Sequence, residues 1–221
     1  MINQSKSRII AHRGCWAGEA NFTKLPQNSS VSLELALNSG FGIEIDIRDY
    51  KGQIYVSHDP ILDIKNCVSL ESILDKNFDQ TIALNVKSDG LLNLLRQTEF
   101  EKLYRKKHFF FDLSFPEEVK YTKLDQVVAT RVSEFEALKI DSSHHLQEYL
   151  WVDSFSDDWW IKDDLILNIL KNNSKVIVVS PELHGRDPKM AWLYLCEIWS
   201  TYENLLVCTD YPFTLCEMLT K

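Results

Sequence analysis

The sequence has no long apolar segment and no cysteine pattern that indicates a disulfide framework. The segment of its first eight residues is polar apart from Met1 and Ile2, and no run approaches the roughly 20 apolar residues of a membrane-spanning helix. The five cysteines are an odd number without C-x-x-C spacing, which favours reduced thiols over disulfides or a zinc site. These absences predict a cytoplasmic protein with no stable membrane insertion.

Basic residues are fewer than acidic residues in this sequence. The chain has 24 lysines and arginines against 32 acidic residues, a formal net charge of −8 at pH 7. Bulk electrostatics therefore argues against a nucleic acid or an anionic membrane surface as a partner. An anionic small molecule would need local positive charge, and the candidates to supply it are Arg13, Lys87, Arg131 and Arg186.

Instead of linkers or low-complexity segments, the sequence contains regularly recurring apolar runs. The chain of 221 residues, 45% of them apolar, is long enough to bury one sizeable core, so we expect a single domain over residues 1–221. Strand-like runs occupy residues 9–11, 43–47, 82–86, 108–113, 126–130, 149–152, 176–179 and 205–208. Most precede helix-like or loop segments, which indicates the α/β class and a closed barrel of eight parallel strands. Residues 54–57 form an extra element in the second loop.

Charged residues gather at the ends of the first two strands. His12 and Arg13 end the first run, before Gly14. In residues 42–48 polar and apolar residues alternate strictly, so Glu44 and Asp46 share one face of a strand. Two close carboxylates raise each other's pKa unless a cation lies between them, and oxygen ligands suit Mg²⁺ or Ca²⁺. Taken alone, the same alternation also fits an exposed acidic face of an antiparallel strand.

Two further segments add a histidine and a lysine. Residues 54–60 form a strand-like run that ends in His58, and a pair of histidines suits general acid and base catalysis near neutral pH. In residues 81–87 the i, i+2 pattern places Asn85 and Lys87 on one face of the next strand, where the lysine can meet an anion.

These segments occur in the order of a known motif set, formed by His12-Arg13-Gly14, Gln27-Asn28-Ser29, Glu44-Ile45-Asp46, His58-Asp59 and Asn85-Val86-Lys87. The chain thereby resembles the glycerophosphodiester phosphodiesterase family, within the phosphatidylinositol phospholipase C-like phosphodiesterase superfamily. The resemblance implies a (β/α)₈ TIM barrel with one bound divalent cation. It also implies roles for six residues: His12 and His58 as the acid/base pair, Glu44 and Asp46 as metal ligands, and Arg13 and Lys87 as phosphate contacts.

The chain departs from this family at three places. Only residues 60–80 separate the second histidine from the third barrel strand, so the family's frequent inserted subdomain has no room. Gln27 stands where the family usually has glutamate, and Asn85 where it usually has a metal-binding glutamate. The amide of Asn85 still offers a carbonyl oxygen, but the loss of an anionic ligand weakens binding of a hard cation. We expect Glu182 to compensate.

The carboxyl-terminal half adds polar residues after its strands, where they face the active-site mouth of a parallel barrel. Glu182, His184 and Arg186 lie in residues 180–186, directly after a strand. Such a loop suits recognition of phosphate or sugar hydroxyls, although a surface salt bridge is the alternative. For Arg131, a structural ion pair and a substrate contact both stay open.

We therefore expect a metal-dependent phosphodiester hydrolase that acts on a small glycerophosphodiester or a related sugar or lipid-headgroup phosphodiester. The expected catalytic residues are His12 and His58. The expected substrate-binding residues are Arg13, Lys87, Arg131, His184 and Arg186. The expected ligands of Mg²⁺ or Ca²⁺ are Glu44, Asp46, Asn85 and Glu182. Two alternatives remain: a non-catalytic barrel that binds a phosphosugar or headgroup, and a lyase that releases a cyclic phosphate.

Overall fold

The computed structural model describes residues 5–136, 148–162, 165–171 and 174–220. The strands are β1 (Ile9–His12), β2 (Gly42–Tyr50), β3 (Gln53–Val56), β4 (Val68–Ser69), β5 (Ile82–Val86), β6 (His108–Phe111), β7 (Ala129–Val132), β8 (Tyr149–Val152), β9 (Lys175–Val179) and β10 (Leu205–Thr209). The helices are α2 (Ser30–Asn38), α3 (Leu70–Leu74), α4 (Leu91–Thr98), α5 (Phe100–Leu103), α6 (Phe115–Thr122), α7 (Trp159–Lys162), α8 (Leu165–Lys171), α9 (Lys189–Trp199) and α10 (Pro212–Leu219), with the 3₁₀ helix η1 (Pro181–His184).

The sheet is mostly parallel. Parallel ladders join the strands in the order β6, β5, β2, β1, β10, β9, β8 and β7. Between the two ends of this order, an isolated parallel bridge joins Phe110 to Val128, and the Phe110 amide donates a 2.9 Å hydrogen bond to the Val127 carbonyl. β3 pairs antiparallel with residues 47–50 at the end of β2, and β4 pairs antiparallel with β3, which confirms an extra element after the second parallel strand.

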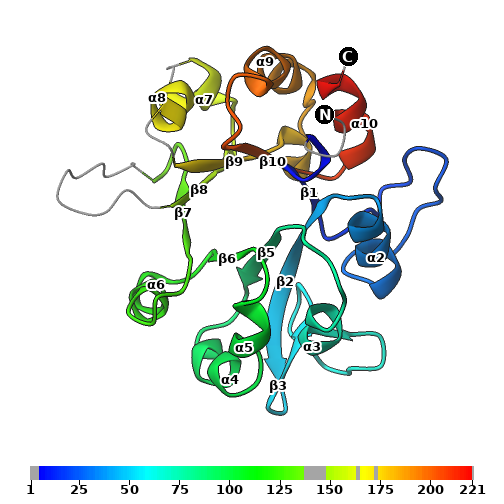
Figure 1. Cartoon of the computed structure of the whole chain (residues 1–221), viewed down its shortest axis with the longest axis vertical. Coiled ribbons are helices and arrows are strands. Elements are labelled where there is room, and N and C mark those ends of the chain that lie inside the picture. Colours follow the sequence, from blue (N-terminus) through cyan, green and yellow to red (C-terminus); the bar gives the residue numbers. More distant parts are fainter. Residues whose placement is uncertain (1–4, 137–147, 163–164, 172–173, 221) are drawn as a thin grey trace.

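The two faces of the strands bury different sets of residues. One face packs against the helices, which lie outside the strands (Figure 1). The other face forms a second apolar cluster that includes residues of β1, β5, β6, β7, β8, β9 and β10 but none of the helices α2 to α10. In this second cluster Phe109 stacks on Tyr149 with ring centroids 4.8 Å apart, and Phe111 on Trp151 at 3.9 Å. Burial on both faces explains why these strands are continuous apolar runs in the sequence.

The parallel strands lie close to their expected positions, with one clear shift. The run expected at residues 126–130 forms a strand only at Ala129–Val132. Asp125 has a φ of 55°, and the Gln126 amide bonds the Tyr121 carbonyl at 3.1 Å. These two residues therefore finish the end of α6 instead of beginning the strand, and Arg131 falls inside β7 rather than after it.

The helices show the expected end signals. Ser29 caps α2 in a capping box with Ser32, as the run of polar residues before the helix predicts. α9 begins at Lys189, after Pro188, and ends at Trp199. Trp192 and Trp199 of this helix are buried in the helix-facing core.

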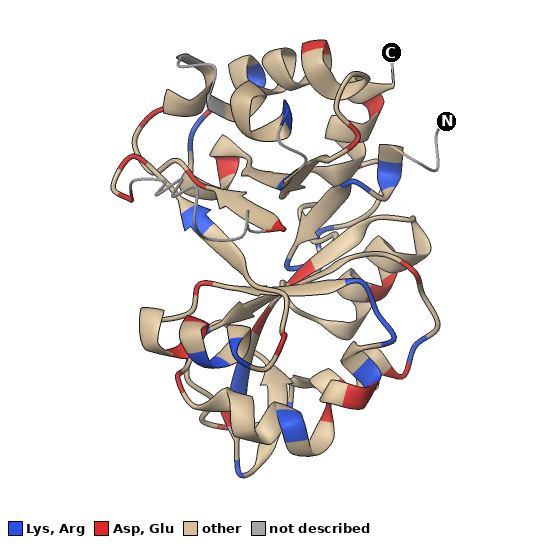
Figure 2. Cartoon of the chain, turned by 60° about the vertical axis from the view of Figure 1, so that its left-hand side comes forward, with Lys and Arg blue, Asp and Glu red and all other residues tan. Residues whose placement is uncertain are grey.

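No described helix is long and apolar enough to cross a bilayer. Figure 2 shows acidic and basic residues interspersed along the ribbon, so the excess of negative charge does not collect on one face in that view.

Candidate active site

A cavity of about 330 Å³ lies at the carboxyl ends of the parallel strands. The residues from the expected site that line it are His12, Arg13, Glu44, Asn85, Lys87, Arg131 and His184. The remaining lining includes Trp16, Gln27, Asp112, Asp153, Asp210 and the aromatic rings of Phe111, Trp151 and Phe155. This is the end of a parallel α/β sheet at which ligands bind.

His12 is held by an aspartate from the last strand. β1 pairs with β10, which brings the end of β1 beside Asp210, the residue after β10. His12 Nδ1 lies 2.7 Å from Asp210 Oδ1, and Trp16 Nε1 donates to the same oxygen at 3.2 Å. Burial lowers the pKa of His12, but the bond to Asp210 and the charge of Glu44 outweigh it and raise that pKa above its usual value. The bond to Nδ1 leaves the other ring nitrogen for proton transfer.

Glu44 and Asp46 form a buried acidic pair on β2. Glu44 is 1% exposed and Asp46 is fully buried. Burial, with a second contribution from Asp46, raises the pKa of Glu44 to about 7. Glu44 Oε2 lies 3.9 Å from His12 Nε2, so the imidazole stands between Glu44 and Asp210.

Asp46 is contacted by three side chains, two from the loop between β1 and α2 and one from the loop after β5. Arg13 Nε lies 2.9 Å from its Oδ2, Lys87 Nζ lies 3.3 Å from its Oδ1, and Asn28 Nδ2 donates to Oδ2 at 2.8 Å. Gln27 Oε1 accepts a 3.0 Å bond from Arg13. The buried carboxylate therefore fixes both cations at the cavity.

A tight turn after β1 aims Arg13 into the site. Arg13 has a φ of 57° and Gly14 a φ of 85°, both in the left-handed region. A Cβ on Gly14 would lie 2.6 Å from the carbonyl carbon of Ser32, because the turn packs on the first turn of α2. Only glycine fits this position, since it alone combines free access to positive φ with no side chain.

Three oxygen-bearing side chains could hold a hard cation. Asp46 and Asn85 are register partners on β2 and β5, and Glu44 is two residues before Asp46. Asn85 Oδ1 is buried and has no hydrogen-bond partner among the described residues, and its side chain also hydrogen-bonds Asp112. Nowhere in the described part of the chain do three or more His, Cys, Asp or Glu side chains come together as a metal site. The donor set is thus two carboxylates and an amide oxygen, which fits Mg²⁺ or Ca²⁺ with one anionic ligand fewer than three carboxylates supply.

His58 does not line the cavity. Its side chain is 50% exposed, and its Nδ1 lies 2.9 Å from Oδ1 of the exposed Asp59. Its backbone carbonyl accepts a 2.9 Å bond from Arg48 Nε. The structure therefore does not bring His58 together with His12 around the cavity.

Glu182 and Arg186 also lie outside the cavity lining. Glu182 accepts hydrogen bonds from the hydroxyls of Ser180 and Thr209, and from the Asp210 amide at 3.1 Å. Its carboxylate is thereby committed to the loop that carries Asp210. Arg186 Nη1 donates to Asp158 at 2.6 Å, which makes it one half of a salt bridge that anchors its own loop.

The cavity contains two aspartates whose partners the sequence did not indicate. Asp153, directly after β8, lies 2.7 Å from His184 Nε2. Asp112 lies 3.0 Å from Arg131 Nη1, and Arg131 also pairs with Glu136 at 2.8 Å. Each aspartate follows a strand, and the parallel pairing of neighbouring strands is the signal that would have linked them to their partners.

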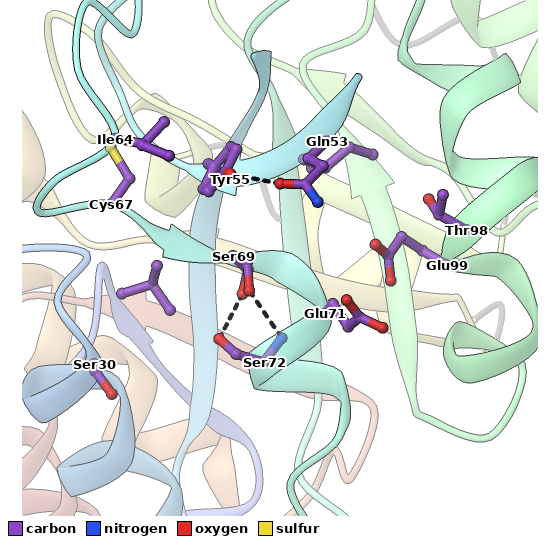
Figure 3. Close-up of a pocket in the computed structure, with 12 residues that line it drawn as sticks. Ser30, Gln53, Tyr55, Ile64, Cys67, Ser69, Glu71, Ser72, Thr98 and Glu99 are labelled. Atoms are coloured by element: carbon purple, nitrogen blue, oxygen red, sulfur yellow. Dashed lines mark hydrogen bonds between the residues drawn. The ribbon is translucent and has the colours of Figure 1, made fainter. Parts of the chain in front are cut away.

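A larger cavity of about 720 Å³ lies elsewhere, beside β3, β4 and α3 (Figure 3). Its lining includes Tyr55, Cys67, Glu71 and Glu99, and none of the residues expected in the site.

Comparison with known proteins gives a likeness of fold. No family model matches the sequence, and no curated protein matches it. Among solved structures, the chain is similar to a protein of Silicibacter pomeroyi DSS-3 described as "Putative glycerophosphoryl diester phosphodiesterase", with a TM-score of 0.60 and 14% sequence identity. The alignment covers 99% of this chain and 97% of that one. The resemblance noted in the sequence is thus confirmed at the level of the fold.

Proposed function

We propose that this protein is a phosphodiester hydrolase acting on a glycerophosphodiester or a related sugar or lipid-headgroup phosphodiester. The observation that carries the proposal is the imidazole of His12, oriented by Asp210 in the cavity that also receives Arg13 and Lys87. Phosphoryl transfer requires an oriented general acid or base and fixed positive charge beside the phosphate, and these residues supply both.

The scaffold of this proposal is a closed (β/α)₈ barrel. The isolated bridge between Phe110 and Val128 supports closure between β6 and β7. So does the second apolar cluster, to which seven of the eight parallel strands contribute, while β2 supplies the acidic pair. A closed barrel explains why residues of the first and last strands share one cavity.

In the proposed reaction, Arg13 and Lys87 contact the phosphate oxygens and stabilise the charge that develops on them. His12 carries a proton to or from a reacting oxygen, and Asp210 keeps its ring in the productive orientation. Glu44, Asp46 and Asn85 would hold the divalent cation, which would supply further positive charge for the phosphate. Glu182, whose carboxylate is occupied by Ser180 and Thr209, would support the loop of Asp210 rather than bind the metal.

The proposal is tested by ³¹P NMR of purified protein with a panel of glycerophosphodiesters and sugar or headgroup phosphodiesters. We expect a monoester product that forms with Mg²⁺ or Ca²⁺ and is suppressed by chelator. The variant His12→Gln should be slower by about 100-fold or more, the usual contribution of an acid/base group. A stable cyclic phosphate would instead identify a lyase. No turnover across the panel would contradict hydrolysis and favour a barrel that only binds such a ligand.

A further inference from the structure

The cavity holds a second histidine that is fixed in the same manner as His12. His184 Nε2 lies 2.7 Å from Asp153 Oδ1, the same separation as between His12 Nδ1 and Asp210. In both pairs the aspartate follows one parallel strand, and the histidine ends or follows the strand beside it. Both histidines and both aspartates line the cavity.

The environment of His184 restricts its ring. Asp153 accepts a 2.9 Å bond from the Ser154 amide, which fixes the carboxylate. The imidazole lies against Phe155, with ring centroids 4.9 Å apart. Arg186, two residues later, ties the loop to the Ser154 carbonyl at 2.6 Å. Preorganisation of this kind is what positions a catalytic group.

Exposure separates His184 from His58. The side chains of His12 and His184 are 15% and 25% exposed, and their aspartates 13% and 11%. His58 is 50% exposed, and its partner Asp59 is 88% exposed. An exposed pair in water neither holds an imidazole in one orientation nor excludes solvent from it.

We propose that His184, oriented by Asp153, is the second catalytic imidazole of this site, in the place that the sequence motif assigns to His58. This inference rests on the proposed function. The Nε2 bond to Asp153 leaves Nδ1, which has no hydrogen bond among the described residues, to meet the substrate.

The two imidazoles account for both proton transfers of hydrolysis. The oxygen of water forms a new bond to phosphorus while the bond from phosphorus to the leaving alcohol oxygen breaks. One imidazole takes the proton from the attacking water, and the other, protonated beforehand, gives its proton to the leaving alkoxide. Proton exchange with solvent then restores both rings.

The first test compares His184→Gln with the matched variant His58→Gln on the diester that the wild type hydrolyses. We expect His184→Gln to lower kcat by about 100-fold or more with KM little changed, and His58→Gln to stay within a few-fold of the wild type. A p-nitrophenolate leaving group departs without a proton from a general acid. On a p-nitrophenyl diester, whichever of His12→Gln and His184→Gln lacks the general acid should therefore recover activity. The variant that lacks the general base should not. Recovery of neither variant would contradict the assignment, because neither imidazole would then act as the general acid. Full activity of His184→Gln together with loss in His58→Gln would overturn the assignment.

A second test does not depend on turnover. Protein labelled with ¹⁵N-histidine is titrated with inorganic phosphate while the imidazole resonances are followed by NMR, with the same two variants used to assign the peaks. Phosphate should shift the signals of His12 and His184 and leave His58 unchanged. A shift at His58 without one at His184 would overturn the inference. Absence of diesterase activity alone would count against the proposed function, and the titration would still decide the placement of His184.

Discussion

Replacing Glu44 by glutamine should make the protein less sensitive to pH. The carboxyl of Glu44 is buried beside Asp46, and its pKa is raised to about 7 from an ordinary value of 4.5. Between these two pH values the folded protein holds a proton that the unfolded chain has released. The stability that Glu44 contributes is therefore complete below pH 4.5 and is lost as the pH rises to about 7.

The size of the effect follows from the same two values. Each pH unit between them corresponds to about 1.4 kcal/mol, so ionising Glu44 costs the folded state about 3 kcal/mol. Glutamine carries no such cost, and its amide oxygen can still accept the bond that the Arg13 amide gives to Glu44 Oε2 at 3.3 Å. The quantity to compare is the free energy of unfolding of Glu44→Gln minus that of the wild type. This difference should be about 3 kcal/mol more positive at pH 8 than at pH 4.5.

The assay is urea denaturation followed by tryptophan fluorescence at both pH values, in the presence of chelator so that no cation neutralises the pair. Glu101→Gln is the matched control, because Glu101 is 85% exposed and pairs with Arg105 on the surface. The difference in free energy of unfolding between Glu101→Gln and the wild type should change by less than about 0.5 kcal/mol between the two pH values. A Glu44→Gln difference that is the same at pH 4.5 and pH 8 would refute the reasoning, because it would mean that burial beside Asp46 does not hold the proton.

Three other substitutions test the site. Asn85→Asp restores a third carboxylate and should bind Mg²⁺ about tenfold more tightly or better in calorimetry; unchanged affinity would remove position 85 from the metal site. Gly14→Ala should lower the free energy of unfolding by about 2 kcal/mol or more, since its Cβ would lie 2.6 Å from the Ser32 carbonyl carbon; a neutral result would contradict the tight turn. Asp210→Asn should lower kcat by about 100-fold and change KM little, because it removes the charge that orients His12; a pure KM effect would argue against orientation.

The sequence was sufficient to locate most of the parallel strands because most are apolar runs buried on both faces. It was also sufficient to place Glu44 and Asp46 on one face, since side chains of a strand alternate. The strand at Ala129–Val132 begins later than expected because the Gln126 amide hydrogen-bonds the Tyr121 carbonyl at the end of α6. Strand propensity does not predict such a contact.

Side chains in loops were harder to place than strands. His58 comes two residues after β3 and His12 ends β1, but the local chain turns His58 toward Asp59 and solvent. Glu182 is engaged by the hydroxyls of Ser180 and Thr209, and Thr209 is 27 residues away on another strand. Sequence spacing alone does not reveal such partners, whereas the order of strands in the sheet would have suggested them.

The bond between His12 and Asp210 joins residues 198 positions apart. Closing a loop of that length has a large entropic cost, which must be met by the packing of many intervening contacts. No subset of the chain that lacks either the first or the last parallel strand contains the pair. The oriented imidazole therefore comes into existence only when β10 docks against β1, and partly folded chains contain an unoriented His12. Recovery of activity during refolding would thus report the last stage of assembly rather than the formation of individual strands and helices.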